Sequence, residues 1–154
     1  PYKPMTRAMI AQVMYNMNAP SVISPSCNKP DVGQNEWYTK AINWCADWGI
    51  MTGYADGSNL FGTNDTITRE QMCKVIFSRS YSNLEDASRE KYDKLLGTEQ
   101  TSDWAVPYVI WAVDRGVING IDNHDGTYSL DPQGELTRCQ AAQVLANAIN
   151  AGIM

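Results

Sequence analysis

An internal repeat is the feature of this sequence that most constrains its fold. Two tryptophans seven residues apart, a Gly-(Ile/Val)-x2-Gly step, an Asp-Gly pair and a Thr-Arg pair follow one another over 37–69 and again over 104–138. A third Thr-Arg pair at Thr6-Arg7 precedes a similar apolar pattern. The chain therefore holds two complete repeats and the second half of another, as expected for modules that bury their apolar faces against neighbours.

Each complete repeat predicts a helix, a Gly-rich loop and a second helix. Apolar residues recur from Trp37 through Trp44 to Trp48 at helical spacing, which indicates one wide apolar face. Gly49 and Gly116 follow the first helices at the place where a left-handed cap residue is favoured. A Thr-x-x-Gln capping box predicts that the second helices begin at Thr68 and Thr137. Thr6 has no Gln at the matching position.

Segments rich in loop-forming residues separate the modules. We predict boundaries of 1–19 for the second half of repeat 1, 20–80 for repeat 2, and 81–154 for a linker plus repeat 3. Within the linker, a short helix is expected near 88–96. Extended pieces at 60–61 and 129–130 are candidates for pairing, and little strand is expected overall.

Charge and hydropathy exclude several classes of partner. The chain carries 17 Asp and Glu against 12 Lys and Arg, a net charge of −5, which disfavours a broad electrostatic grip on nucleic acid or an anionic membrane. No run of about 18 apolar residues predicts a membrane span. The sequence starts at Pro1 without a leader-like segment, so we expect any export signal to lie outside it.

Neither cysteine spacing nor the acidic loops predict a metal site. The four cysteines show no CxxC pair, so a zinc knuckle is not expected. Cys45 and Cys73 lie on apolar stripes and are predicted to be buried thiols, whereas Cys27, in a Pro/Ser-rich loop, is the candidate for a disulfide. The Asp-Gly loops at 56–57 and 125–126 do not follow the EF-hand pattern and are interpreted as turns.

No catalytic constellation stands out in the sequence. There is one histidine, His124, and the sequence contains neither a nucleophile elbow nor a phosphate-binding loop. We therefore predict that the chain is not an enzyme, with no catalytic residues, no bound metal and no cofactor.

Three arginines occupy positions where helix electrostatics disfavours them. Arg7, Arg69 and Arg138 follow the capping threonines, and a cation in the first turn opposes the helix dipole by about 0.3–1 kcal/mol when exposed. One explanation is a salt bridge to an acidic residue of a neighbouring module. The other is anion capture, in which free helix-terminal N–H groups and a guanidinium fork hold a carboxylate. The two explanations are compatible, because an arginine can pair with an acidic residue and also bind a ligand carboxylate.

The aromatic residues have two interpretations as well. Trp44 and Trp111 lie mid-helix on the apolar stripe and are predicted to be core residues. Trp37 and Trp104 lie in the first turn, where each is either a structural residue or a platform that stacks on a sugar. The glycines that close the Gly-(Ile/Val)-x2-Gly step, Gly53 and Gly120, are expected to need positive φ, and a ligand interpretation adds that a sugar approaches their main chain.

The order of these motifs, in two complete copies and one half copy, resembles the S-layer homology (SLH) domain. The resemblance implies an all-α fold, a pseudo-trimeric spindle of helix–loop–helix modules with grooves between them. Such grooves bind secondary cell-wall polysaccharide, typically with a pyruvylated N-acetylmannosamine unit, and fasten a protein to the cell surface. Other members of the family tether an outer membrane to peptidoglycan. The ligand-contacting positions carried over from the family are Arg7, Arg69, Arg138, Asp31, Asp103, Gly53 and Gly120.

The sequence departs from the family pattern in three ways. Where the family continues Thr-Arg with Ala-Glu, this chain has Ala8-Met9, Glu70-Gln71 and Cys139-Gln140, which changes the partner near each arginine. Asp31 precedes its tryptophan by six residues, whereas Asp103 is adjacent to Trp104. Because the first half of repeat 1 is missing, we expect upstream residues or another chain to complete it. A protein–protein docking module remains the alternative, since Trp- and Tyr-rich helical surfaces also form interfaces.

Overall fold

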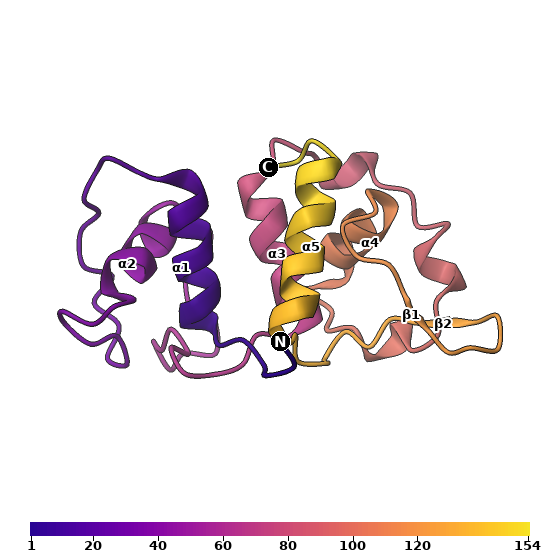
Figure 1. Cartoon of the computed structure of the whole chain (residues 1–154), viewed down its shortest axis with the longest axis horizontal. Helices are drawn as coiled ribbons and strands as arrows, with labels where there is room; N and C mark the ends of the chain where they lie inside the picture. Colours follow the sequence, from indigo (N-terminus) through magenta and orange to yellow (C-terminus); the bar gives the residue numbers. More distant parts are fainter. The chain divides into compact units, whose positions relative to one another are not determined.

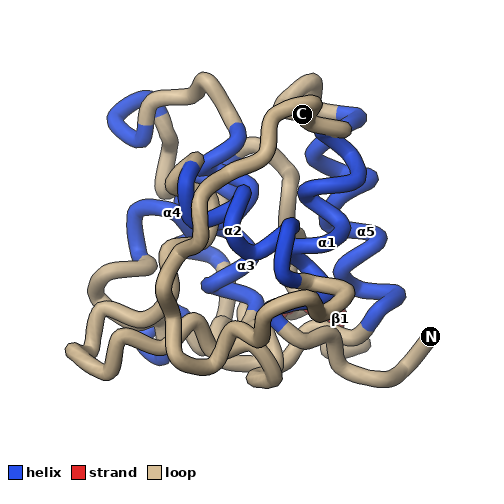
Figure 2. The backbone as a smooth tube through the Cα atoms, turned by 90° about the vertical axis from the view of Figure 1, so that its left-hand side faces the viewer, coloured by secondary structure: helices blue, strands red, loops and turns tan.

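The computed structural model describes all residues, Pro1–Met154, and is mainly helical, as predicted. Short helices are joined by long loops (Figure 1, Figure 2). The α-helices are α1 (Arg7–Asn18), α2 (Thr39–Asp47), α3 (Arg69–Arg79), α4 (Val106–Asp114) and α5 (Arg138–Asn150). Three single-turn 3-10 helices are η1 (Leu84–Asp86), η2 (Tyr92–Lys94) and η3 (Thr98–Gln100), and a two-stranded antiparallel sheet pairs β1 (Ile121–Asp122) with β2 (Tyr128–Ser129).

The chain forms two compact units. One unit comprises Met5–Ile67, and the other comprises Thr68–Met154 together with Pro1–Pro4. Each unit therefore packs the second helix of one module onto the first helix of the next, α1 on α2 and α3 on α4. We describe each unit by itself.

In the unit Met5–Ile67, the apolar faces of α1 and α2 form the core. Ile10, Met14 and Ile42 are fully buried, and Trp44 is nearly so. Tyr15 of α1 meets Trp44 edge to face, with 5.8 Å between ring centroids. Burial of such aromatic surface is a large part of what stabilises a small unit.

In the unit that contains α3, α4 and α5, Trp111 is the buried core tryptophan, as Trp44 is in the unit Met5–Ile67. It is fully buried, as predicted, and Phe77 packs against it edge to face at 5.1 Å. The linker contributes Tyr92, whose hydroxyl contacts Thr98 and Thr101. On α5, the Asn147 side chain donates to the carbonyl of Val117 at 3.1 Å and so ties this helix to the loop after α4.

The helix ends follow the sequence closely. Capping boxes open α3 at Thr68 and α5 at Thr137, whereas at α1 the Thr6 side chain accepts from the Met9 N–H and no side chain bonds back to Thr6. Gly49 and Gly116 have φ of 67° and 70°, which confirms left-handed residues after α2 and α4. These local signals were sufficient because each acts within one turn of helix.

Two expectations about loops were wrong or only partly right. The helix expected near 88–96 is a single 3-10 turn, η2, flanked by η1 and η3. The segment 60–61 forms no strand and so does not pair with the segment 129–130. Strand β2 pairs with β1 instead, and the two strands form a hairpin around the Asp-Gly loop at 125–126.

The cysteines form no disulfide, and Cys27, the one candidate for a bridge, is a free thiol. Cys45 and Cys73 are buried, as predicted. Burial raises the pKa of the Cys73 thiol to about 12, which makes it a poor nucleophile near neutral pH.

Candidate ligand-binding site

The starts of the three Arg-led helices share one construction. The first two backbone N–H groups of each helix donate to two carbonyls of an extended segment, at 2.8–3.2 Å. The acceptors are Asp65 and Thr63 for α1, Gly134 and Pro132 for α3, and Lys3 and Pro1 for α5. The third N–H of each helix donates to the capping threonine. The helix-terminal N–H groups are therefore already used, and their predicted part in anion capture was wrong.

Arg7 clamps the loop that follows Gly53. Its side chain is only 6% exposed, and its Nε donates to the carbonyl of Phe61 at 2.8 Å. The guanidinium lies 4.6 Å from the ring centroid of Tyr54, whose hydroxyl donates to Asp65 at 2.8 Å. Burial lowers the pKa of Arg7, and Tyr54 and the nearby acidic residues act in the opposite direction. Arg7 is thus held on several sides within its own unit.

Asp31 fixes the same loop from the other side. Its carboxylate accepts from the backbone N–H groups of Phe61, Gly62 and Thr63 at 2.8, 2.8 and 2.9 Å. Desolvation alone would raise the pKa of Asp31, but these three bonds outweigh it and the pKa lies below its ordinary value. The carboxylate is therefore charged and fully engaged with the backbone at neutral pH.

Gly53 and Gly120 need glycine for different reasons. Gly53 has φ of 93°, and a Cβ there would lie 2.5 Å from the Leu60 carbonyl oxygen. Gly120 is not in the left-handed region, so the expectation of positive φ was wrong for it. Packing excludes a side chain at Gly120 instead, because a Cβ would lie 2.6 Å from Tyr128 and 2.7 Å from Leu95.

Arg69 differs from Arg7 in what surrounds its guanidinium. It is equally buried, at 6% exposure, but only its Nε has a partner, the Asp131 carbonyl at 3.3 Å. No ion pair forms at Arg69, and no aromatic ring covers it. Burial lowers the pKa of Arg69, and the charge of Asp131 opposes that effect. Because arginine stays protonated in proteins, Arg69 is a buried cation with four unused N–H donors.

Glu70, which sequence analysis did not single out as a functional residue, explains why Arg69 lacks an acidic partner. Glu70 is 3% exposed and accepts from Ser102 through both carboxylate oxygens, at 3.0 Å from the N–H and 2.8 Å from the hydroxyl. Gln133 donates to it at 2.9 Å. The carboxylate of Glu70 therefore links the start of α3 to the start of α4 and forms no ion pair with Arg69. Its position beside the Thr-Arg pair is the only signal the sequence offered.

Arg138 and Asp103 are not held in comparable sites. Both side chains are exposed and neither makes a hydrogen bond or ion pair in its unit. Asp103 does not bind backbone N–H groups as Asp31 does, so the two acids are not structurally equivalent. The different spacing of each acid from its tryptophan already indicated this.

Trp37 and Trp104 were expected in the first turn of a helix, but each lies just before the N-cap residue of α2 or α4, and both are exposed, unlike the mid-helix pair. Trp37 is 58% and Trp104 46% exposed. Trp37 meets Tyr38 edge to face at 5.2 Å. On the Trp104 side, Lys74 Nζ lies 5.6 Å from the Trp104 ring centroid and 5.9 Å from that of Tyr108. Both tryptophans present ring surface that a sugar can contact, and at Trp104 a cation accompanies it.

Comparison with known proteins identifies these repeats. The model of the S-layer homology domain matches residues 30–73 and 98–142, which contain both complete Trp-to-Thr-Arg motifs. The chain belongs to the S-layer homology domain family. The two segments matched by the SLH model together cover more than half of the chain.

Relatives of the SLH chain include enzymes and surface-layer proteins. It is 31% identical over 94% of its length to an amylopullulanase of Thermoanaerobacterium thermosulfurigenes and 33% over 75% to the exoglucanase XynX of Acetivibrio thermocellus. It is 27% identical over 95% of its length to the S-layer protein EA1 of Bacillus anthracis. The chain spans 8%, 10% and 15% of these three proteins, respectively.

Membership of the SLH family confirms the predicted cell-surface location and the wall-anchoring role. SLH repeats are non-catalytic anchoring modules that bind cell-wall polymers. No helix in the structure has both the length and the apolar character that crossing a membrane requires.

Proposed function

We propose that this SLH module binds an anionic, pyruvylated cell-wall polysaccharide of the N-acetylmannosamine type, and that Arg69 holds the pyruvyl carboxylate. The observation that carries the proposal is the state of Arg69, a buried guanidinium with one backbone partner and no ion pair. Its neighbour Glu70 is engaged with Ser102 and Gln133 and makes no ion pair with it, so the charge of Asp131 is the acidic influence on this cation.

Electrostatics favours an acidic ligand at such a group. Burying a charge without a counterion is costly, and a carboxylate that arrives with the ligand offsets that cost. The planar fork of Arg69 can donate two parallel bonds to a carboxylate, the strongest arrangement for this pair of groups. A neutral sugar offers no such gain, so the pyruvyl group is the natural determinant of affinity.

The other residues that were predicted to bind the ligand have smaller roles in this proposal. Arg7, Asp31 and Gly53 act through the loop that they hold, because their polar groups are engaged with it. Arg138 attracts the polymer from solvent, where a single charge contributes little. Trp37 and Trp104 offer stacking faces, Asp103 lies beside Trp104 as a hydrogen-bond acceptor, and Gly120 keeps the hairpin loop closely packed.

Retention on wall polymer with and without its pyruvyl groups tests the proposal. We expect the module to bind the pyruvylated polymer at least about tenfold more tightly than the same polymer after mild acid removal of pyruvate, since a charge-assisted bond contributes about 1.5–3 kcal/mol. Equal retention on both polymers would contradict the role of the acid. No retention on either would favour the alternative, a protein–protein docking or peptidoglycan-tethering module.

A further inference from the structure

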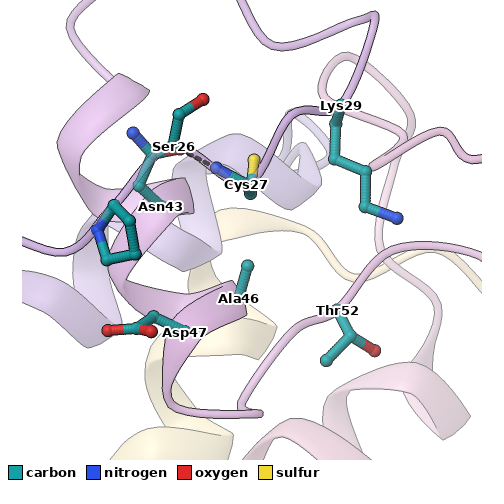
Figure 3. Close-up of a pocket in the computed structure, with 8 residues that line it drawn as sticks. Ser26, Cys27, Lys29, Asn43, Ala46, Asp47 and Thr52 are labelled. Carbon is teal, nitrogen blue, oxygen red and sulfur yellow. Dashed lines mark hydrogen bonds between the residues drawn. The ribbon is translucent and has the colours of Figure 1, made fainter.

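A pocket in the unit Met5–Ile67 contains none of the residues that the sequence predicted to bind a ligand. It has a volume of about 270 Å³ and lies between the segment 25–29 and the C-terminal half of α2, with Thr52 on its rim (Figure 3). Small-molecule pockets in proteins begin at about 300 Å³, so this one is suited to a single sugar ring rather than a longer ligand.

The polar groups of the pocket carry opposite charges. Lys29 and Asp47 both line it, together with the uncharged polar side chains of Ser26, Asn43 and Thr52. Asp47 is the last residue of α2, where the helix dipole adds partial negative charge. An acidic substituent would meet Asp47 and this helix end, so the pocket does not favour an anion as Arg69 does.

Hydrogen-bonding capacity remains open on both sides of the pocket. Asn43 uses its Oδ1 to accept from the Cys27 N–H at 3.1 Å, which leaves its Nδ2 group for another acceptor. Lys29 Nζ donates to Asn59 at 3.0 Å and retains further N–H donors. Asp47 makes no hydrogen bond or ion pair with its side chain. Donors and acceptors on facing walls fit a ligand that has both, such as a sugar with hydroxyl and acetamido groups.

We propose that this pocket is a second saccharide subsite, which binds one uncharged N-acetylhexosamine residue of the wall polymer. Asp47 accepts from sugar hydroxyls, and Asn43 Nδ2 and Lys29 Nζ donate to sugar oxygens. The inference rests on the proposed function in taking the ligand to be a wall polysaccharide, but it does not depend on the pyruvyl group. Two separate contacts on one polymer would raise its retention above that of either site alone.

The corresponding place in the other unit provides a matched control. Asp114 ends α4 as Asp47 ends α2. There the linker fills the neighbourhood, because Lys91 Nζ donates to the Asp114 carbonyl at 2.9 Å and Arg115 Nε lies 3.9 Å from its carboxylate. Asp114→Ala therefore removes the same side chain from the same helix position in the other unit.

Calorimetric titration with an uncharged, pyruvate-free N-acetylmannosamine-containing oligosaccharide tests the subsite. We expect the full chain to bind it, Asp47→Ala to bind it about tenfold more weakly, and Asp114→Ala to bind it as the unsubstituted chain does. Asn43→Asp keeps an acceptor for the Cys27 N–H but replaces the Nδ2 donor with a negative charge four residues before Asp47, so it should weaken binding and lower thermal stability only slightly.

The outcomes separate this inference from the proposed function. No binding of the uncharged oligosaccharide, or equal affinity in Asp47→Ala, overturns the subsite even when Arg69→Ala abolishes binding of the pyruvylated form. Conversely, Asp47-dependent binding of the uncharged form together with equal affinity for pyruvylated and pyruvate-free ligands supports the subsite and overturns the assigned role of Arg69.

Discussion

Arg69→Ala is expected to weaken binding of the pyruvylated polymer on the order of a hundredfold. Truncating one partner of a buried, hydrogen-bonded charge pair typically costs about 2–5 kcal/mol. In the ligand-free chain the guanidinium contributes one bond at 3.3 Å and no ion pair, so its loss should change stability far less than binding. Surface plasmon resonance on immobilised polymer measures the affinity, and thermal unfolding measures the stability.

Two variants control this experiment. Arg69→Lys retains the charge but loses the planar fork, so we expect an intermediate affinity. Arg89→Ala removes an exposed arginine that pairs with Asp93 at 3.1 Å, and it should leave binding unchanged. Unaltered affinity of Arg69→Ala for the pyruvylated polymer would show that the acid binds elsewhere.

Asp31→Ala should lower the free energy of unfolding by about 3 kcal/mol in the transition that reports the unit Met5–Ile67. The substitution leaves three backbone N–H groups without their acceptor, and each lost bond costs about 1 kcal/mol. Urea unfolding followed by the NMR signal of the Trp44 indole N–H measures the change, since Trp44 is buried in the same unit and its signal is resolved from those of the other tryptophans. Asp103→Ala is the matched control, because that carboxylate is exposed and should cost almost nothing.

The three hydrogen bonds that Asp31 accepts from the backbone also predict that the stability of the folded chain falls at acidic pH. The pKa of Asp31 is lower in the folded chain than in the unfolded one, so its stabilisation is fully present above the unfolded value of about 3.9. It is lost as pH falls through the lower, folded value. Below about pH 4 the stability of the unsubstituted chain should therefore fall toward that of Asp31→Ala. A constant difference between the two down to pH 2 would contradict the role of the ionised carboxylate.

Local sequence signals predicted the helices well. Apolar periodicity, the Thr-x-x-Gln boxes and the glycines after α2 and α4 each depend on residues within one or two turns, and the structure has helices at those places. The state of Cys27 and the extent of the helix near 88–96 could not be predicted in this way, because both depend on what a loop packs against, which no local pattern records.

The site could be predicted only in part, because its decisive contacts join residues far apart in sequence. The Arg69 N–H is bonded to Gly134, and Glu70 is bonded to Ser102. Neither pair shares a motif, so the occupied N–H groups at the helix start and the unpaired state of Arg69 were not foreseeable. Similarly, no spacing rule connects Lys29 with Asp47, and their pocket emerges only when the segment 25–29 packs beside α2.

Side-chain NMR of the arginine guanidinium groups tests the central claim most directly. With 15N-labelled chain and the signals of Arg69 assigned through the Arg69→Lys variant, pyruvylated N-acetylmannosamine is titrated in. We predict that the Arg69 Nε and Nη signals shift and that their N–H protons exchange more slowly with water, whereas pyruvate-free N-acetylmannosamine leaves them unchanged. Saturable binding of the pyruvylated sugar with no change at the Arg69 signals would contradict the account.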